Sequence, residues 1–342
     1  MAGLEGGGLV LGSARCGSTL VSDILRAHPD VLSVSELFST AGPHAFRPDR
    51  PTGAWFWRHL ATPSRALSAV GNPVAAPREF LYGRVRDPAH DPFRCPPILA
   101  VTLPHLTGDP DRAFADLGRA MRARGAHPLA DQYRALFAAM APLAGRPRVW
   151  VERSGGSLVA AGTLGILFPE ARRVLLWRDG PDTALSMRDY PAARAAIWTW
   201  RALRRVGLDL LDPRGHFGRG AAWPLVSAIT GGAGLRRIVR VRPTLEECGA
   251  FWSTVVEAGL RSLDRRAVLV LRYDDLCREP RAQIARLGRH LAGAAPEAWL
   301  AATEALPRAR PSRAAGLDRA DRDALARACA PGEAAFRAWS SG

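Results

Sequence analysis

The stretch of sequence that most constrains the fold is GLVLGSARCGSTLVSDIL, at residues 8–25. An apolar run leads into Gly12 and Gly17, which have four residues between them, and a helical pattern follows. A strand that turns through a glycine loop into a helix forms an anion site, because loop N–H groups and the helix N-terminus attract negative charge. We therefore expect a P-loop-like strand-loop-helix. The alternative is an ordinary strand-to-helix turn capped by a hydroxyl side chain.

The loop lacks the lysine that nucleoside triphosphatases place after the second glycine, since Ser18 stands there. All 47 basic residues are arginine, so lysine Schiff bases, lysine general bases and Walker-type or protein-kinase lysines are excluded. The loop instead carries Arg15, whose guanidinium can stabilise a leaving phosphate electrostatically. No evident Walker-B aspartate ends an apolar run, so the sequence gives little support to a magnesium-triphosphate site.

The formal net charge of +15 favours a nucleic-acid or anionic-membrane partner. The arginines are dispersed, however, and the abundance of Ala, Gly and Pro is typical of a GC-rich genome. We therefore expect no nucleic-acid partner, although a basic nucleic-acid-binding protein stays an alternative. No apolar stretch reaches the roughly 18–20 residues of a membrane span. No basic segment or long apolar region with a cleavage site precedes the first apolar run, so we expect a cytoplasmic protein.

The cysteines and histidines argue against a disulfide framework and a metal site. The five cysteines are odd in number and have no paired spacing, which favours a reducing compartment and argues against a zinc cluster. The eight histidines show no metal-binding spacing, so we expect no metal.

Apolar runs bounded by turn residues alternate with helical patterns. Strands are predicted at residues 9–11, 98–103, 149–151, 174–177 and 268–271. Helices are predicted at residues 18–27, 113–124, 129–143, 158–168, 246–263 and 280–292. The alternation predicts a doubly wound α/β fold with a mostly parallel central sheet.

The whole chain, residues 1–342, is predicted to form a single domain. Its core is expected at about 6–38, 96–190 and 246–292, and a C-terminal cap at 296–342 includes a helix that begins near Asp318. Segments at about 38–97 and 191–243 break the alternation, and we expect helical insertions there that form the site of an acceptor, because ligands of open α/β sheets bind at the carboxyl ends of the strands. Five tryptophans of these segments are candidates for an apolar acceptor cleft or for core packing: Trp55, Trp57, Trp198, Trp200 and Trp223.

The loop sequence ARCGST resembles the one that holds the 5′-phosphosulfate in sulfotransferases that use 3′-phosphoadenosine 5′-phosphosulfate as donor. The resemblance covers residues 9–38, 148–187 and 246–292, and weakly 312–325. For the loop, it implies donor contacts from Ser13, Ala14, Arg15, Cys16, Gly17, Ser18 and Thr19.

Three further stretches carry the resemblance. LLWRDGPDTALSM is similar to the family's 3′-phosphate motif and supplies Arg178 and Ser186, which can bond one phosphate from two sides. VLVLRYDDLCREP is similar to a late strand of the family, and its acidic residues are expected to be structural. Ser312 and Arg313 resemble a late donor-binding loop.

The stretch ILRAHPDVLSVSELF resembles the segment in which bacterial and tyrosylprotein-type members place a catalytic glutamate. The resemblance therefore implies that Glu36 is the base that takes the acceptor's proton, and that Arg15 is its catalytic partner at the leaving phosphate. The alternative for Glu36 is a helix cap or a surface charge. His28, His44 and His59 are alternative bases.

The implied reaction is metal-free transfer of a sulfuryl group from 3′-phosphoadenosine 5′-phosphosulfate to the hydroxyl of an acceptor, which leaves adenosine 3′,5′-bisphosphate. The alternatives are a P-loop small-molecule kinase and a non-catalytic nucleotide-binding protein. A thiol phosphatase is excluded. Such an enzyme needs an arginine six residues after its loop cysteine, and the residue six positions after Cys16 is Ser22. This sequence departs from the family pattern at Cys16, at Gly180 in place of proline and at Arg153 where lysine is common. Nothing in the sequence indicates the acceptor or the oligomeric state.

Overall fold

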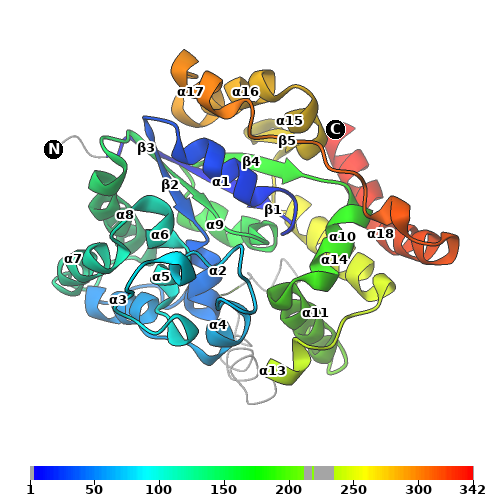
Figure 1. Cartoon of the computed structure of the whole chain (residues 1–342), viewed down its shortest axis with the longest axis horizontal. Coiled ribbons are helices and arrows are strands. Elements are labelled where there is room, and N and C mark those ends of the chain that lie inside the picture. Colours follow the sequence, from blue (N-terminus) through cyan, green and yellow to red (C-terminus); the bar gives the residue numbers. More distant parts are fainter. Residues whose placement is uncertain (1–3, 212–217, 219–234, 342) are drawn as a thin grey trace.

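The computed structural model describes residues 4–211, 218 and 235–341. Its centre is a five-stranded, entirely parallel sheet in the order β2-β3-β1-β4-β5 (Figure 1). The strands are β1 (Gly6–Gly12), β2 (Val31–Ser35), β3 (Val149–Arg153), β4 (Arg172–Trp177) and β5 (Val268–Arg272). The α/β fold class with a parallel sheet is thus confirmed.

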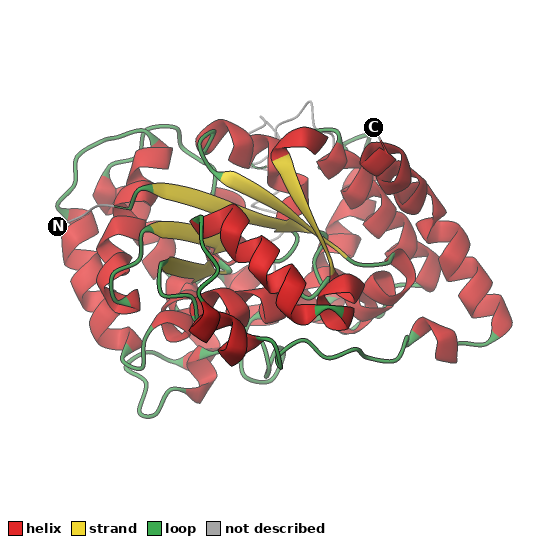
Figure 2. Ribbon diagram, turned by 90° about the horizontal axis from the view of Figure 1, so that it is seen from above, coloured by secondary structure: helices red, strands yellow, loops and turns green. Residues whose placement is uncertain are grey.

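Helices cover both faces of this sheet, as the view from above shows (Figure 2). On one face lie α1 (Ser18–Arg26), α15 (Tyr273–Arg278), α16 (Pro280–Ala292) and α17 (Glu297–Thr303). On the other lie α8 (Leu129–Met140), α9 (Ala161–Leu167), α14 (Leu245–Leu260) and α18 (Arg319–Ser341). The remaining α-helices are α2 (Leu37–Ala41), α3 (Gly53–Ala61), α4 (Arg65–Val70), α5 (Pro97–Ala100), α6 (Thr102–Leu106), α7 (Pro110–Arg122), α10 (Gly180–Asp189), α11 (Pro191–Arg204) and α13 (Leu235–Ile238).

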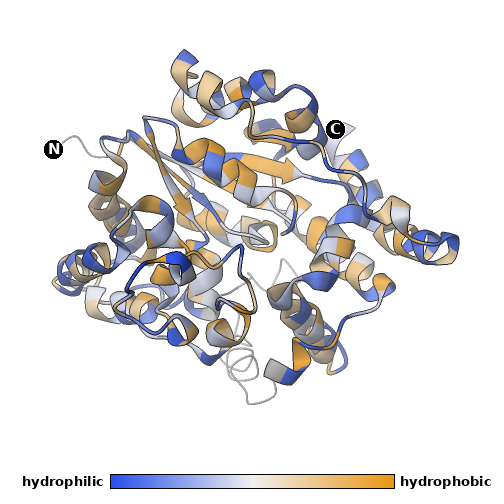
Figure 3. Cartoon of the chain, viewed as in Figure 1, coloured by the Kyte–Doolittle hydropathy of each residue, from blue (hydrophilic) through white to orange (hydrophobic). Residues whose placement is uncertain are grey.

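The continuous apolar runs of the strands arise because both strand faces are buried. Leu9 and Leu11 of β1 face the α14 and α18 side, whereas Val10 between them faces α1 and α16. The same alternation places Leu175 and Val174 of β4 on opposite faces. Figure 3 shows the apolar colour gathered on β4 and on α1, which packs against the sheet.

One predicted strand is wrong. Residues 98–103 form parts of two short helices, α5 and α6. Pro97 opens α5, and Ile98, Leu99 and Leu103 are fully buried. A short apolar run buried on all sides has no periodicity that separates a helix from a strand, and proline at the first helical position favours the helix.

The sequence prediction also missed β2, the edge strand. Its sequence, VLSVS, alternates apolar residues with serine, yet all five residues are buried. Thr102 donates to the carbonyl oxygen of Ser35 at 2.8 Å, and the hydroxyl of Ser33 donates to the carbonyl oxygen of Ser22. Hydrogen bonds within the protein therefore let polar residues occupy a buried strand.

The other predicted strands and helices lie where β1, β3, β4, β5, α1, α7, α8, α9, α14 and α16 are found. The terminal helix predicted to begin near Asp318 is α18. The segment at 38–97 contains α3 and α4, and the segment at 191–243 begins with α11. Trp223 and the rest of 219–234, with 212–217, lie outside the described residues. The single-domain organisation and the role of the insertions stay predictions.

Candidate functional site

The loop between β1 and α1 has an unusual backbone conformation. Ala14, Arg15 and Gly17 have positive φ angles of 69°, 56° and 98°. A Cβ atom on Gly17 would lie 2.5 Å from Cδ2 of the Tyr273 ring, so glycine is required there both by its φ and by the close ring. A glycine-containing turn that leads into a helix directs backbone N–H groups toward the helix N-terminus, which favours an anion there. The loop then enters the N-terminus of α1, whose first turn carries no acidic residue.

Two predicted donor-binding residues of this loop direct their side chains elsewhere. The hydroxyl of Ser13 accepts a hydrogen bond from Nε1 of Trp252 at 3.2 Å, inside the core. Cys16 is fully buried, and burial raises the pKa of its thiol to about 11. A protonated, inaccessible thiol is not a nucleophile. Only the backbones of these two residues are available to a ligand.

A cavity of about 490 Å³ lies beside the loop. It brings together five of the residues expected at the site, namely Ala14, Arg15, Ser18, Thr19 and Glu36. The charged residues that line it are Arg15, Arg78, Arg84, Arg153, Asp23, Glu36 and Glu79. Four arginines face three carboxylates, so the cavity carries an excess of positive charge that suits an anionic ligand.

Arg15 contacts three residues from distant parts of the chain. Its Nε donates to the hydroxyl of Ser186 on α10 at 3.2 Å. Its Nη1 forms an ion pair with Glu79 at 2.9 Å, and its guanidinium lies 4.7 Å from the centre of the Tyr190 ring. Arg15 belongs to the loop, which the resemblance assigned to the 5′ end of the donor. Its hydrogen bond to Ser186 joins the loop to the motif that the resemblance assigned to the 3′-phosphate. Sequence analysis did not predict the contact with Glu79.

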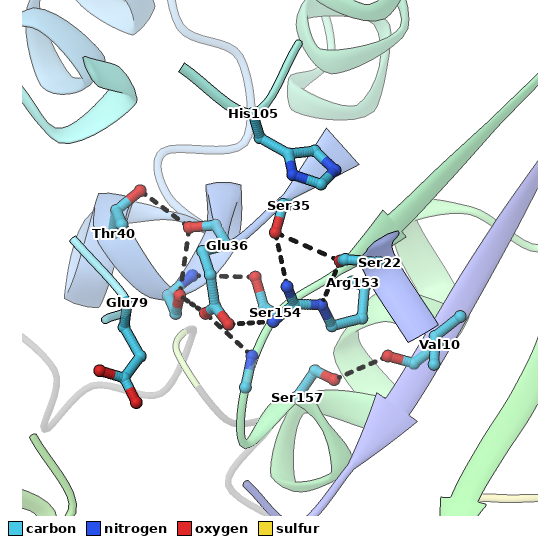
Figure 4. Close-up of polar contacts among 12 residues, drawn as sticks. Val10, Ser22, Ser35, Glu36, Thr40, Glu79, His105, Arg153, Ser154 and Ser157 are labelled. Carbon is cyan, nitrogen blue, oxygen red and sulfur yellow. Dashed lines mark hydrogen bonds and ion pairs between the residues drawn. The ribbon is translucent and has the colours of Figure 1, made fainter. Parts of the chain in front are cut away.

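Glu36 lies at the carboxyl end of β2 and caps α2 with a left-handed φ of 59°. One carboxylate oxygen accepts from Nη1 of Arg153, and the other accepts from the backbone N–H of Gly155 at 2.9 Å and from the hydroxyl of Ser39 (Figure 4). A carboxylate offers about four acceptor positions. The donors among the described residues fill three, which leaves capacity for one more hydroxyl. About 23% of the side chain is exposed.

Arg153 is the residue that holds Glu36, and sequence analysis named it only as a departure from the family pattern. It ends β3 and is almost completely buried. Its Nε donates to the hydroxyl of Ser22 at 2.7 Å and its Nη2 to that of Ser35, as Figure 4 shows. With all three nitrogens engaged, the guanidinium is fixed in place. Sequence analysis could have found Arg153 from its position at the carboxyl end of a predicted strand, because ligands of open α/β sheets bind there.

A second carboxyl group, Glu152, lies behind Glu36. Its Oε1 accepts from the hydroxyl of Ser154 at 2.6 Å and from the backbone N–H of Phe38 at 3.4 Å. Complete burial, together with the charge of Glu36, raises the pKa of Glu152 to about 8, although the hydrogen bond from Ser154 opposes the rise. Glu152 is therefore neutral at pH 7 and supports the turn into α2 without adding charge to the site.

Glu152 should make the stability of the protein depend on pH. Between its ordinary pKa of 4.5 and the raised value of about 8, the folded chain keeps a proton that the unfolded chain has lost. The free energy of unfolding therefore falls as pH rises through this window, by at most about 1.4 kcal/mol per pH unit. The free energy of unfolding can be measured with urea between about pH 5 and 8. In Glu152→Gln it should fall less steeply with rising pH than in the unchanged protein. An unchanged slope, with Glu170→Gln as the exposed control, would contradict the assignment.

Arg178, one of the two predicted 3′-phosphate residues, belongs to a neighbouring cluster around Asp182 on α10. Arg178 contacts the Asp182 carboxylate at 3.5 Å and stacks over the Tyr273 ring at 4.8 Å. The hydroxyl of Ser312 donates to the same carboxylate at 3.0 Å, which brings the late loop to this cluster. Arg313 turns away to Asp189, at 2.6 Å.

This cluster is connected to the loop. Ser186 lies one helical turn after Asp182, so both residues lie on one face of α10. Because Arg15 bonds Ser186 and Tyr273 packs against Gly17, the two predicted phosphate sites are adjacent. No direct contact joins Arg178 to Ser186 among the described residues; Asp182, which sequence analysis missed, lies between them.

The histidines considered as alternative bases lie away from the cavity that holds Arg15. His28 caps α1, where Nδ1 accepts from the N–H of Asp30 and Nε2 lies 3.3 Å from the carbonyl oxygen of Ala294. His44 and His59 do not line that cavity but a neighbouring pocket, which shares Ser39 and Thr40 with it, and burial lowers the pKa of His59 to about 4. His105, which was not predicted, does line the cavity; it is buried, its pKa is lowered by burial to about 3, and Nε2 contacts Ser33.

No protein-family model matches the chain, and no curated protein matches it. Nine solved chains do match. The sulfotransferase domain of the Synechococcus PCC 7002 olefin synthase is 16% identical, with a TM-score of 0.41, over 96% of each chain. The sulfotransferase STF9 from Mycobacterium avium is 16% identical, with a TM-score of 0.45, over 98% of this chain and 76% of that one. The sulfotransferase domain of the curacin biosynthetic pathway is 15% identical, with a TM-score of 0.42, over 94% and 90%.

Membrane-spanning helices and metal-binding clusters are both absent from the described part of the chain. No helix there is both long and apolar enough to cross a membrane. Likewise, residues 4–211, 218 and 235–341 contain no group of three or more His, Cys, Asp or Glu side chains placed to hold a metal ion.

Proposed function

We propose that the chain is a sulfotransferase that uses 3′-phosphoadenosine 5′-phosphosulfate as donor and an alcohol as acceptor. One observation carries the proposal: an arginine in an anion-binding loop lines the same cavity as a carboxylate that has a free acceptor position. Arg15 is suited to a leaving phosphate, and Glu36 to the proton of an attacking hydroxyl. Ser186 of the second motif contacts Arg15, which supports a role for both motifs in binding one donor.

The residues present fit the proposed donor, which supplies the activated sulfuryl group. The loop backbone, Ser18 and Thr19 would hold its 5′ end, where the N-terminus of α1 stabilises negative charge. Arg178 and Ser312 would hold the 3′-phosphate, since both already bind the Asp182 carboxylate and a phosphate offers the same kind of acceptor. Arg15 would leave Glu79 and turn to the bridging oxygen.

Glu36 would take the acceptor proton while Arg153 keeps its carboxylate in place. The ion pair and the N–H of Gly155 orient the carboxylate, so the vacant acceptor position has a fixed direction. A positioned base within hydrogen-bond reach contributes about 10²–10⁴-fold to a transfer reaction. Arg153 is in this view a positioning residue, because it acts on the substrate through Glu36.

A P-loop kinase is the second enzyme class to weigh, and the end of β3 argues against it. P-loop triphosphatases hold magnesium with a Walker-B aspartate. At the end of β3, Arg153 directs a cation into the site, and Glu152 is buried and neutral at pH 7. The chain also has no lysine to contact the phosphates.

Thermal unfolding with different ligands tests the donor class. Adenosine 3′,5′-bisphosphate should raise the melting temperature, and a hundredfold excess over its Kd should add about 2.7 kcal/mol of stability. ATP with magnesium should add little. The opposite ranking would favour a kinase. Binding of nucleic acid that weakens steeply with salt, without any effect of the bisphosphate, would favour a nucleic-acid-binding protein.

Arg178→Ala should chiefly weaken donor binding. Loss of a charge-assisted contact to the 3′-phosphate should cost about 2 kcal/mol, or about thirtyfold in Kd for adenosine 3′,5′-bisphosphate by calorimetry. Adenosine 5′-monophosphate, which lacks the 3′-phosphate, is the matched ligand and should bind both proteins equally. Equal weakening of both ligands would mean that Arg178 acts only through the fold, by way of Asp182.

A further inference from the structure

A second cavity, of about 370 Å³, adjoins the one that holds Arg15 and Glu36. The two share lining residues at the loop and at the start of α11, including Ala14, Gly155 and Tyr190. Its volume falls within the range of about 300–1,000 Å³ that is usual for small-molecule sites. A molecule lying in this second cavity would therefore reach the proposed reaction centre at its Ala14 end.

The lining of the second cavity contains no charged side chain among the described residues. One wall is a face of α11 with small residues at helical spacing, Ala192, Ala195, Ala196 and Thr199. The remainder is mostly aliphatic and aromatic, with Val70, Val159, Met187, Trp200, Leu210, Leu211, Leu235, Phe251 and Val255. This composition contrasts with the first cavity, which is lined by seven charged residues.

The chemistry of this lining selects among acceptors. The lining offers few hydrogen-bonding groups, among them the hydroxyls of Ser39 and Tyr190 and the buried Nε1 of Trp200, which has no partner among the described residues. A sugar or a charged group placed here would lose more hydrogen bonds to water than these groups replace, which is unfavourable. An aliphatic or alicyclic body would leave water for an apolar surface, which is favourable. The alanines of α11 leave width for such a body, because any larger side chain at those positions would occupy the space.

We propose that the acceptor is an alcohol whose hydroxyl is carried on an uncharged, largely apolar body, and that this body lies in the second cavity. The inference rests on the proposed sulfotransferase function. The alcohol oxygen would form a bond to the sulfur, while the bond from sulfur to the bridging oxygen breaks and its electron pair stays on the 5′-phosphate. The hydroxyl proton would pass to Glu36.

A series of acceptors tests this assignment. With labelled donor, kcat/KM should rise about two- to fourfold per methylene from n-butanol to n-octanol, for as long as the chain fits the cavity. Glucose and ω-hydroxydecanoate, one polar and one charged, should each be at least tenfold poorer than n-decanol. Transfer to glucose that exceeds transfer to n-decanol would overturn the inference while leaving the proposed function intact.

A variant that narrows the cavity gives a second readout. Ala196→Leu should lower kcat/KM for n-decanol at least tenfold and abolish the thermal stabilisation that n-decanol gives in the absence of donor. Ala202→Leu is the matched control, because Ala202 is on the same helix but not among the lining residues. Both variants should bind adenosine 3′,5′-bisphosphate as the unchanged protein does.

The outcomes separate the two proposals. If Ala196→Leu and Ala202→Leu affect n-decanol equally, the cavity does not hold the acceptor and the inference fails. If the unchanged protein does not bind adenosine 3′,5′-bisphosphate, the sulfotransferase function fails, whatever the alcohols do.

Discussion

Glu36→Gln is expected to lower kcat by about 10²–10⁴-fold, because an amide keeps the shape of the carboxylate but takes up no proton. The amide oxygen can still accept from Arg153, whereas the hydrogen bond from the N–H of Gly155 to the second oxygen is lost. The fold should survive, because one hydrogen bond at a partly exposed side chain is a small part of the total stability. The measurement is single-turnover sulfate transfer at saturating donor, together with calorimetry of adenosine 3′,5′-bisphosphate, whose Kd should change little.

The control for this substitution is Glu170→Gln, which removes an exposed carboxylate paired with Arg134 and should leave transfer unchanged. Full activity of Glu36→Gln would contradict the proposal that Glu36 is the catalytic base. In that case the contacts of Glu36 would serve to stabilise the turn into α2, which Glu36 also caps.

Arg15→Ala should lower kcat by about 10²–10³-fold, the loss typical of removing one preorganised group that stabilises charge in the transition state. About 30% of the Arg15 side chain is exposed, and its hydrogen bonds reach Ser186 and Glu79 at the cavity rather than the core. The melting temperature should therefore change little. Rapid-quench measurement of the transfer step separates this effect from a change in donor affinity.

Arg26→Ala is the matched control for Arg15→Ala. Arg26 is the last residue of α1, the helix that follows the loop, and it does not line the cavity. It removes the same charge without touching the site. Full activity in both Arg15→Ala and Arg178→Ala would overturn the sulfotransferase assignment as a whole.

The fold was predictable where residues face apolar surroundings on both sides. Continuous apolar runs marked β1, β3, β4 and β5, and the glycine loop marked the turn into α1. β2 escaped prediction because its serine hydroxyls are satisfied by partners outside the strand, such as the carbonyl oxygen of Ser22 and the guanidinium of Arg153. The run at 98–103 was misassigned because uniform burial erases periodicity.

The site was predictable only where its residues follow one another along the chain. The loop residues and Glu36 lie within one continuous stretch, and Ala14, Arg15, Ser18, Thr19 and Glu36 line one cavity. Glu79 and Asp182 were not predicted, because nothing local marks a carboxylate as the partner of a particular arginine. The position of Arg153 at the end of a predicted strand was a local signal. Its partners Ser35 and Glu36 could not be predicted, because they come close to it only through the pairing of β2 with β3.

The ion pair between Arg15 and Glu79 has a consequence for selectivity. The carboxylate of Glu79 is an internal competitor for the guanidinium that the donor needs, so the apparent donor affinity is the intrinsic affinity scaled by the fraction of molecules in which the pair is open. A ligand must therefore offer Arg15 more than a carboxylate does. A neutral nucleoside such as adenosine offers Arg15 no anion in exchange for Glu79, so the pair disfavours its binding without any steric barrier. The effect is modest, because both side chains of the pair are about 30% exposed.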